Sequence, residues 1–360
     1  MAKKGIFGLD LFLIVPVLIL VGVSLVTLFS LSFDLFRSQF IFLIISLIFF
    51  FFFSQVNYKV LKIYSLPIYI VSIVLLILVL FLGFESRGSI RWLDILGFRI
   101  QFSEILKPFL AVSFATYLID NRKYDFKFLI SIFFLVAPIA LLIFFQPDLG
   151  DALIYMAVVI TTIVYLGFPV KYFLAILVPI AAIFPFFWKV LKVYQRQRIL
   201  TFLNPGSDPL GTSYNVIQSV IAVGSGMIMG KGLGQGTQSG LRFLPERNTD
   251  FIFATISEQL GFIGAVILLL AFAFFLYKVY TIFLNSGDKF SKVFAAIVFF
   301  TFLIQIFVNI GMNIGIVPIV GVTLPFVSTG GSSLLSNFIL LGFLSALSKS
   351  SKDKNVLEIR

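Results

Sequence analysis

The sequence predicts an all-α, polytopic membrane protein with about ten transmembrane helices and both termini in the cytoplasm. Of its 360 residues, 60% are hydrophobic and only 12% are charged, and the mean hydropathy is +1.09. Soluble domains carry about 25% charged residues, and no water-soluble fold could hide this much apolar surface. The composition therefore excludes a soluble globular enzyme, a disordered chain and a disulfide scaffold.

Two residue types are absent from the sequence, which contains no Cys and no His. The chain therefore has no disulfide, no thiolate nucleophile and no imidazole base or metal ligand. The formal net charge is +11, but in a membrane protein the side on which each charge lies matters more than the sum. No nucleic acid is expected among the partners.

Charge-free stretches mark the predicted spans, because about 20 apolar residues cross the hydrocarbon layer as a helix. Glycine and proline residues after Gly311 divide the last uncharged stretch, Val293–Ser348, into two helices. The first span lacks a cleavage site of small residues, so it is not expected to be a removable signal peptide. The other eight spans are Leu11–Leu31, Ser38–Tyr58, Ile63–Phe84, Glu104–Ile119, Phe128–Pro147, Ala152–Val170, Tyr172–Trp188 and Gln259–Tyr277.

The positive-inside rule tests this count of spans. With the N-terminus in the cytoplasm, more than half of the 27 Lys and Arg residues fall into short inner connections and tails, as the rule requires. Nearly all the others lie in two longer outer segments, Gly83–Ser103 and Lys189–Asp250. Both termini are therefore predicted to be cytoplasmic.

The longer outer segment, residues 189–250, is polar and rich in glycine. It contains Val216–Val223, an apolar run too short to span a membrane. Loops of this length without structure are uncommon unless they are functional or disordered, and the apolar content argues against disorder. We expect an ordered outer loop with a short interfacial or re-entrant helix, within a single integral membrane domain that comprises residues 1–360.

Several candidate site residues lie where spans meet the outer side. Glu104 and Lys107 are three residues apart and can pair on one helix face, either as a structural ion pair or as site groups. Asp148 precedes the sixth span, where it could cap the helix or face a site. Arg91 and Trp92 are typical of headgroup anchoring.

The long loop carries further candidates. Arg196 and Arg198 lie near its start, and Lys231 lies in the run Gly230–Gly236. This run is not a P-loop, because Lys231 is followed by glycine rather than Ser or Thr. Backbone of this kind beside cations could cradle a phosphate, or it could be a flexible surface loop.

Asp250 lies where the polar loop meets the eighth span, shortly after Glu246 and Arg247. An aspartate there can cap a helix, and a carboxylate at the membrane surface also suits a general base for a lipid-borne substrate. Ser332 belongs to Leu324–Ser333 between the last two spans. Irregular backbone at membrane depth is tolerated only inside protein or along a cavity, so this segment is predicted to form a cavity wall.

Taken in order, these groups resemble the SEDS family (shape, elongation, division and sporulation) of peptidoglycan glycosyltransferases. Gly236-Thr237-Gln238 and Pro245-Glu246-Arg247 resemble the rod-shape, elongation (RodA) type more than the division (FtsW) type. The sequence departs from the usual family pattern at Phe102, Asp151, Asn248, Gln259 and Thr329. The matching segments are Arg91-Trp92, Gln101–Lys107, Gln146–Gly150, Tyr194–Ile199, Asn204–Gly211, Tyr214–Ala222, Gly230–Gln238, Pro245–Ala254 and Leu324–Ser333.

The resemblance implies polymerisation of lipid II, a disaccharide-pentapeptide on undecaprenyl pyrophosphate, at the outer face of the cytoplasmic (inner) membrane. An acceptor hydroxyl attacks the anomeric carbon of the growing lipid-linked glycan, with inversion, and the pyrophosphate leaves. Such a reaction needs a carboxylate base and positive charge on the leaving group. Asp250 matches the family's essential catalytic aspartate. The expected substrate-binding residues are Arg91, Trp92, Glu104, Lys107, Asp148, Arg196, Arg198, Lys231, Glu246, Arg247 and Ser332.

The resemblance also implies a partner, a class B penicillin-binding protein with transpeptidase activity, besides the membrane lipids. The sequence identifies no metal site, although a divalent cation (Mg²⁺ or Mn²⁺) shared between carboxylates and pyrophosphate is an open alternative. A flippase or other transporter of lipid-linked precursors is the main alternative function, and a structural scaffold is a third. One loop holds most of the polar residues, rather than matched broken helices in two repeats, and this favours an enzyme.

Overall fold

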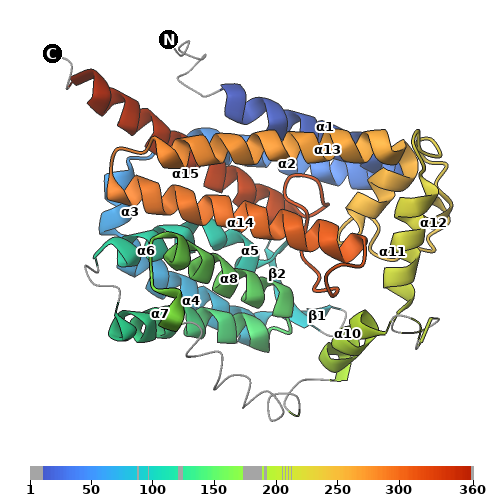
Figure 1. Cartoon of the computed structure of the whole chain (residues 1–360), viewed down its shortest axis with the longest axis horizontal. Helices are drawn as coiled ribbons and strands as arrows, with labels where there is room; N and C mark the ends of the chain where they lie inside the picture. The colour runs from blue at the N-terminus through green and yellow to red at the C-terminus, as the bar shows by residue number, and fades with distance from the viewer. Residues whose placement is uncertain are drawn as a thin grey trace.

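The computed structural model describes residues 11–86, 89–95, 97–120, 125–172, 189, 193–204, 206, 208–209, 211 and 213–357. Helices dominate these ranges (Figure 1). The elements are α1 (Leu11–Leu31), α2 (Phe33–Phe53), α3 (Tyr58–Ile63), α4 (Ser65–Leu82), β1 (Phe84–Ser86), β2 (Ser89–Ile95), β3 (Phe98–Ile100), α5 (Phe102–Ile105), α6 (Lys107–Asp120), α7 (Phe126–Phe145), α8 (Leu149–Tyr165), α10 (Val193–Leu203), α11 (Tyr214–Ser225), α12 (Thr237–Gly240), α13 (Ile252–Leu284), α14 (Lys289–Asn313) and α15 (Gly331–Leu357).

The predicted spans correspond to these helices in order. Within the described ranges, seven helices are long and apolar enough to cross a membrane, namely α1, α2, α4, α7, α13, α14 and α15. The shorter apolar helices α6 and α8 match the fourth and sixth predicted spans. The predicted seventh span, Tyr172–Trp188, lies outside the described residues except for Tyr172. The all-helical, polytopic fold is thus confirmed.

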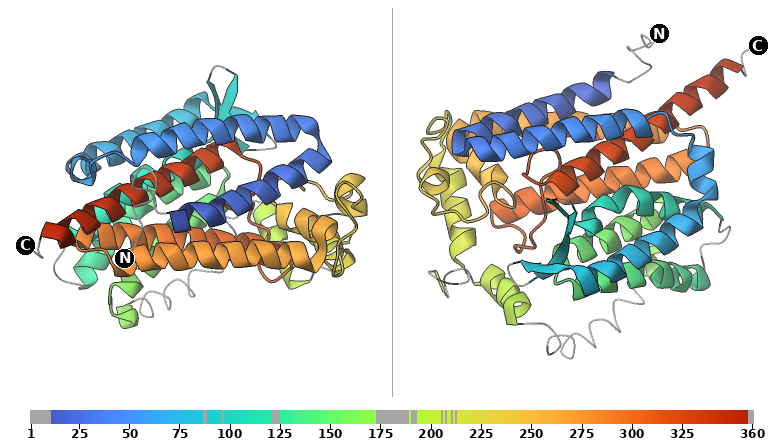
Figure 2. Two further views of the ribbon diagram at one scale, coloured as in Figure 1. Left: turned by 90° about the horizontal axis from the view of Figure 1, so that it is seen from above. Right: turned by 180° about the vertical axis from the view of Figure 1, so that it is seen from behind.

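The long helices run side by side, with α15 in the interior of the bundle (Figure 2). Helix α15 packs against α2, while α13 packs between α1 and α14. Helix α1 begins and α15 ends at one end of the molecule, and α11 and α12 lie at the opposite end (Figures 1 and 2). This is the relative placement that the predicted topology requires of the termini and the long loop.

A small antiparallel sheet, with strand order β1-β2-β3, occupies the connection between α4 and α5. No strand was predicted there, because the connection is rich in charged residues. Phe84 pairs with Trp92, and Asp94 pairs with Arg99 across the tight turn between β2 and β3. The Oδ1 atom of Asp94 accepts a hydrogen bond from the Gly97 N–H at 2.8 Å, which closes that turn. The sheet holds Arg91 as well as Trp92 and Arg99.

Helix α13 is interrupted at Gly261, whose φ of 66° is not helical. The neighbouring N–H groups of Phe262 and Ile263 donate instead to the carbonyls of Met227 and Ile228, at 2.8 and 3.2 Å. A Cβ atom at Gly261 would collide with the backbone of residues 228 and 230. Glycine is therefore required at the break, which accommodates the segment that follows α11.

The described parts of the predicted long loop include the helices α10, α11 and α12. Helix α11 contains the short apolar run Val216–Val223, and the segment after it lies against the broken turn of α13. Two more backbone bonds, from Lys231 N–H to the Glu258 carbonyl and from Gly232 N–H to the Gln259 carbonyl, extend this pairing. Such bonds satisfy backbone groups that apolar surroundings would otherwise leave unpaired.

Candidate active site

A cavity of about 1130 Å³ is lined in part by residues of the segment 242–250, which follows α12. Its wall includes α2, the β2–β3 hairpin, α5, the start of α8, two irregular segments, residues 242–250 and 321–330, and the first turn of α15. The segment Leu324–Ser333 was predicted to form part of a cavity wall, and the lining by Thr329–Ser333 confirms this. Eight of the predicted site residues line the cavity, namely Arg91, Trp92, Glu104, Asp148, Glu246, Arg247, Asp250 and Ser332.

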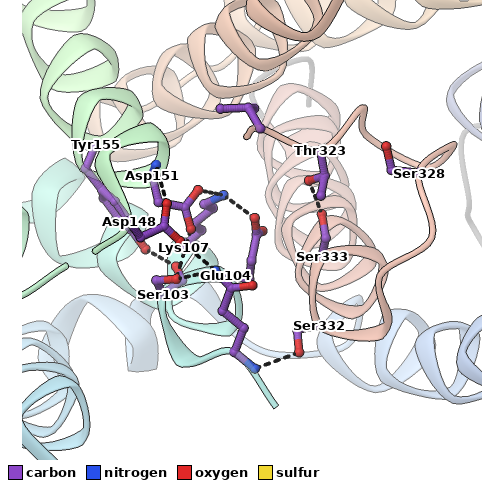
Figure 3. Close-up of polar contacts among 12 residues, drawn as sticks. Ser103, Glu104, Lys107, Asp148, Asp151, Tyr155, Thr323, Ser328, Ser332 and Ser333 are labelled. Atoms are coloured by element: carbon purple, nitrogen blue, oxygen red, sulfur yellow. Dashed lines mark hydrogen bonds and ion pairs between the residues drawn. The ribbon is translucent and has the colours of Figure 1, made fainter. Parts of the chain in front are cut away.

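A buried ion cluster borders the cavity, and its polar contacts are drawn in Figure 3. The Nζ atom of Lys107 is 2.9 Å from Glu104 Oε1, as predicted, and also 2.9 Å from Asp151 Oδ1. Asp151 in turn accepts a hydrogen bond from Ser103 Oγ at 2.9 Å. Lys107 is 5% exposed and does not line the large cavity, so its charge is already balanced within the protein. Asp151 was not among the residues predicted for the site.

Asp148 both caps a helix and belongs to the cavity wall. Its Oδ1 atom accepts from the Asp151 N–H at 3.2 Å, which caps α8. Its Oδ2 atom accepts from Gln101 Nε2 at 2.9 Å and pairs with Arg91 Nη1 at 3.2 Å. Ser332 Oγ accepts from the Gln101 N–H at 2.9 Å, which joins the start of α15 to this wall. The two interpretations of Asp148 from sequence are therefore compatible.

Four arginines, Arg91, Arg99, Arg242 and Arg247, line the cavity together with the carboxylates of Glu104, Asp148, Asp151, Glu246 and Asp250. Burial alone would lower the pKa of Arg91, but the carboxylates of Asp148, Asp151 and Asp250 more than offset this and raise it. Burial and the nearby Arg242 lower the pKa of Arg247, although a guanidinium stays protonated in proteins. Arg99 and Arg242 were not among the residues predicted for the site.

Asp250 lies just before α13, in a segment whose backbone is fixed by other elements. The Thr329 N–H donates to the Asn248 carbonyl at 2.8 Å, and Ser328 Oγ donates to the Thr249 carbonyl at 2.6 Å. Gly321, with φ +74°, packs beside the carboxylate, since a Cβ there would lie 3.5 Å from Asp250 Oδ2. The loop between α14 and α15 therefore holds the segment that presents Asp250 to the cavity.

Besides Lys107, two predicted residues, Lys231 and Arg196, do not line the cavity. Lys231 Nζ pairs with Glu258 Oε1 at 3.1 Å, which attaches the glycine-rich run to α13 and away from Asp250. Arg196, on α10, donates to the Lys189 carbonyl at 2.6 Å and is not part of the cavity lining. Arg198 also lies on α10, but its side chain is outside the described part of the chain.

The described residues include no group of three or more metal-binding side chains arranged to hold a metal ion. Glu104 and Asp151 come close together only around the ammonium of Lys107. A divalent cation would have to displace that ammonium, so this pair of carboxylates does not fit a metal ion.

Residues 4–353 match the FtsW/RodA/SpoVE family, described as cell cycle protein. The chain belongs to this family. It is 39% identical over 295 residues to "Peptidoglycan glycosyltransferase MrdB" of Escherichia coli, which covers 81% of this chain and 78% of that protein. It is 34% identical over 360 residues to "Stage V sporulation protein E" of Bacillus subtilis, with 95% and 98% covered. The resemblance to the SEDS family is thus confirmed.

Solved structures of related proteins agree with this assignment. One of them is a chain from the structure "Structural coordination of polymerization and crosslinking by a peptidoglycan synthase complex". It superposes with a TM-score of 0.84 at 30% sequence identity, over 96% of this chain and 99% of its own length. The rod shape determining protein RodA of Thermus thermophilus has a TM-score of 0.72 at 24% identity, over 95% of this chain and 97% of its own. The second likeness concerns the fold alone.

This family member should depend on Lys107 for stability. Lys107→Met leaves the buried carboxylates of Glu104 and Asp151 facing each other without a cation, and breaking such a pair costs about 3–5 kcal/mol. We expect Lys107→Met to unfold at a clearly lower temperature in detergent, as followed by thermal unfolding.

The double variant Lys107→Met/Asp151→Leu should recover part of the lost stability, because it removes one of the two facing charges. The control is Lys59→Met, at an exposed lysine on α3. If Lys107→Met and Lys59→Met unfold at the same temperature, the cluster does not contribute to stability in this way.

Proposed function

We propose that this chain, a peptidoglycan glycosyltransferase of its family, polymerises lipid II at the outer face of the cytoplasmic membrane. The observation that carries the proposal is a single cavity that combines the Asp250 carboxylate with four arginines. The segment 242–250 offers the proton acceptor Asp250 together with Arg242 and Arg247, and the β2–β3 hairpin offers Arg91 and Arg99. An acceptor hydroxyl and a departing diphosphate need these two features together.

In the proposed reaction, Asp250 is the general base. The acceptor sugar hydroxyl gives its proton to the Asp250 carboxylate while its oxygen forms a bond to the anomeric carbon of the lipid-linked glycan. The bond from that carbon to the diphosphate oxygen breaks, and its electron pair leaves with undecaprenyl pyrophosphate. The single displacement inverts the anomeric carbon and needs no nucleophilic side chain.

We assign the diphosphate to the arginines rather than to Lys107. Lys107 is fully engaged by two carboxylates, and Lys231 is paired with Glu258 outside the cavity. Arg91 is oriented by Asp148 at 3.2 Å, and Arg247 is held by the Ser239 carbonyl. Arg99 and Arg242 are more exposed and line the same cavity. Arginine suits diphosphate because its planar fork can donate two parallel hydrogen bonds.

The first test removes the base. Asp250→Asn keeps the side-chain shape but cannot accept the proton, and a lost general base typically costs about 10²- to 10⁴-fold in rate. We expect the purified variant to fold with the thermal stability of the wild type yet to form essentially no glycan from lipid II. Glu246→Gln, four residues earlier on the same wall, is the matched control and should lose less activity.

Two results would redirect this assignment. If Asp250→Asn polymerised lipid II within a few-fold of wild type, the base would have to be another cavity carboxylate, Asp148 or Glu104. If the wild-type protein moved lipid II across vesicle membranes without forming polymer, the alternative function, a flippase, would be favoured.

The second test removes positive charge. A hydrogen bond to a charged group contributes about 1.5–3 kcal/mol, so Arg242→Gln and Arg99→Gln should each raise the KM for lipid II roughly tenfold or more. Arg37→Gln, at an exposed arginine on α2 outside the cavity lining, should leave KM unchanged. If all three variants have the KM of the wild type, Arg99 and Arg242 do not bind the diphosphate.

We further propose a class B penicillin-binding protein as partner, docked on lipid-facing side chains of α13 and α14, and a role in cell elongation. The similarity to a chain of a peptidoglycan synthase complex supports a partner. Leu270 on α13 and Phe307 on α14 are 64% and 62% exposed. The elongation role rests on Gly236–Gln238 and Pro245–Arg247, since the relatives include division and sporulation proteins as well.

The partner proposal predicts that an elongation-type transpeptidase co-purifies with the chain from native membranes. Leu270→Ala/Phe307→Ala should weaken that capture, whereas Phe12→Ala, at a residue of α1 that is 63% exposed, should not. Capture of a division-type transpeptidase would contradict the elongation role, and repeated absence of any transpeptidase would contradict the partner.

A further inference from the structure

Two buried asparagines on α14 contact the backbone of Asp250. Asn309 and Asn313 are four residues apart, so they lie on one face of the helix, and both are 0% exposed. The Nδ2 atoms of Asn309 and Asn313 donate to the Asp250 carbonyl at 3.0 and 2.9 Å respectively. A single carbonyl oxygen thus receives two side-chain donors from the neighbouring helix.

The amide of Asn313 replaces a bond that a continuous helix would make. Its Oδ1 atom accepts a hydrogen bond from the Ala254 N–H at 3.0 Å. In an α-helix that began earlier, the Ala254 N–H would donate to the carbonyl of Asp250, four residues before it. The next N–H, of Thr255, donates to the Phe251 carbonyl in that ordinary pattern. The side chain of Asn313 is therefore inserted between Asp250 and the first turn of α13.

Asn309 extends the arrangement to the segment on the other side of Asp250. The two hydrogens on its Nδ2 atom are used by the carbonyls of Asp250 and Val322, the latter at 2.7 Å. Val322 follows Gly321, which packs beside the Asp250 carboxylate. Asn313 Nδ2 also donates to the Asn309 carbonyl at 2.8 Å. Helix α14 thereby connects the two segments that flank the carboxylate.

We infer that Asn313 and Asn309 are positioning residues for Asp250, which keep it outside α13 with its carboxylate at the cavity wall. Without the inserted amide, the buried Ala254 N–H regains a partner most directly by closing the turn onto the Asp250 carbonyl. That closure draws Asp250 into the helix and moves its carboxylate. The inference rests on the proposed function, in which Asp250 is the base.

The experiment compares Asn313→Leu, which removes the amide at similar volume, with Asn309→Ala/Asn313→Leu. Because a displacement of about 1 Å can cost on the order of 100-fold in rate, kcat with lipid II should fall about 10-fold in the single variant and about 100-fold in the double variant. The KM for lipid II should stay within about 2-fold, since the arginines that we assign to the diphosphate are untouched.

The matched control is Gln305→Leu. Gln305 precedes Asn309 by four residues on the same face of α14, is 0% exposed, and its amide has no hydrogen-bond partner among the described residues. This variant removes a buried amide without affecting Asp250, so kcat should be unchanged. Asn313→Gln, which keeps an amide, should retain several-fold more activity than Asn313→Leu. Thermal unfolding checks that each variant is folded. If the double variant does not fold, the kcat of Asn313→Leu alone tests the inference.

The inference is overturned if Asn313→Leu and the double variant keep kcat within 3-fold of wild type, or if Gln305→Leu lowers kcat as much as Asn313→Leu. A rise in KM at constant kcat also overturns it. Activity in Asp250→Asn would overturn the assignment of the base itself, whatever the asparagine variants do. An inactive Asp250→Asn beside normal asparagine variants would overturn the positioning role alone.

Discussion

The structure depends on one constraint, that polar backbone groups in apolar surroundings need partners inside the protein. Helix α13 departs from regular geometry at its start and at Gly261, and both departures are compensated. At Gly261 the segment after α11 supplies backbone carbonyls, and at the start of the helix Asn313 supplies an amide. The candidate site is therefore formed where helices are irregular, and the surrounding regular spans provide the groups that make the irregularity stable.

Charged groups follow the same logic. Lys107 is buried, and it lies between two carboxylates. The cations that line the cavity come instead from the sheet and from the segment after α12, where the chain is more exposed. The protein thus separates charges that stabilise the bundle from charges that are available to a bound molecule. We regard this separation as the main reason to prefer the arginines over Lys107 as diphosphate ligands.

Nine of the ten spans predicted from hydropathy correspond to described helices, because the length and apolarity of a crossing helix are properties of the local sequence. The Glu104–Lys107 pair was predictable for the same reason, since three residues separate its members. Asp151 was not recognised as the second partner of Lys107, because no local pattern relates residues 44 positions apart. The ion pair of Lys231 with Glu258 and the contacts of Asn313 with Asp250 and Ala254 likewise require the tertiary structure. The sheet was not predicted because its strands are short and carry charged residues, which are also typical of headgroup anchoring at the membrane surface.

Glu258 connects the glycine-rich run to the span more strongly than its position in the sequence implies. It is 0% exposed, and its carboxylate accepts bonds from the N–H groups of Gln238 and Ser239 at 2.9 and 2.8 Å, besides the pair with Lys231. The Ser239 carbonyl in turn holds Arg247 at the cavity. A tilt of α13 would therefore move Glu258, and through its bonds to residues 238 and 239 it would also move Arg247.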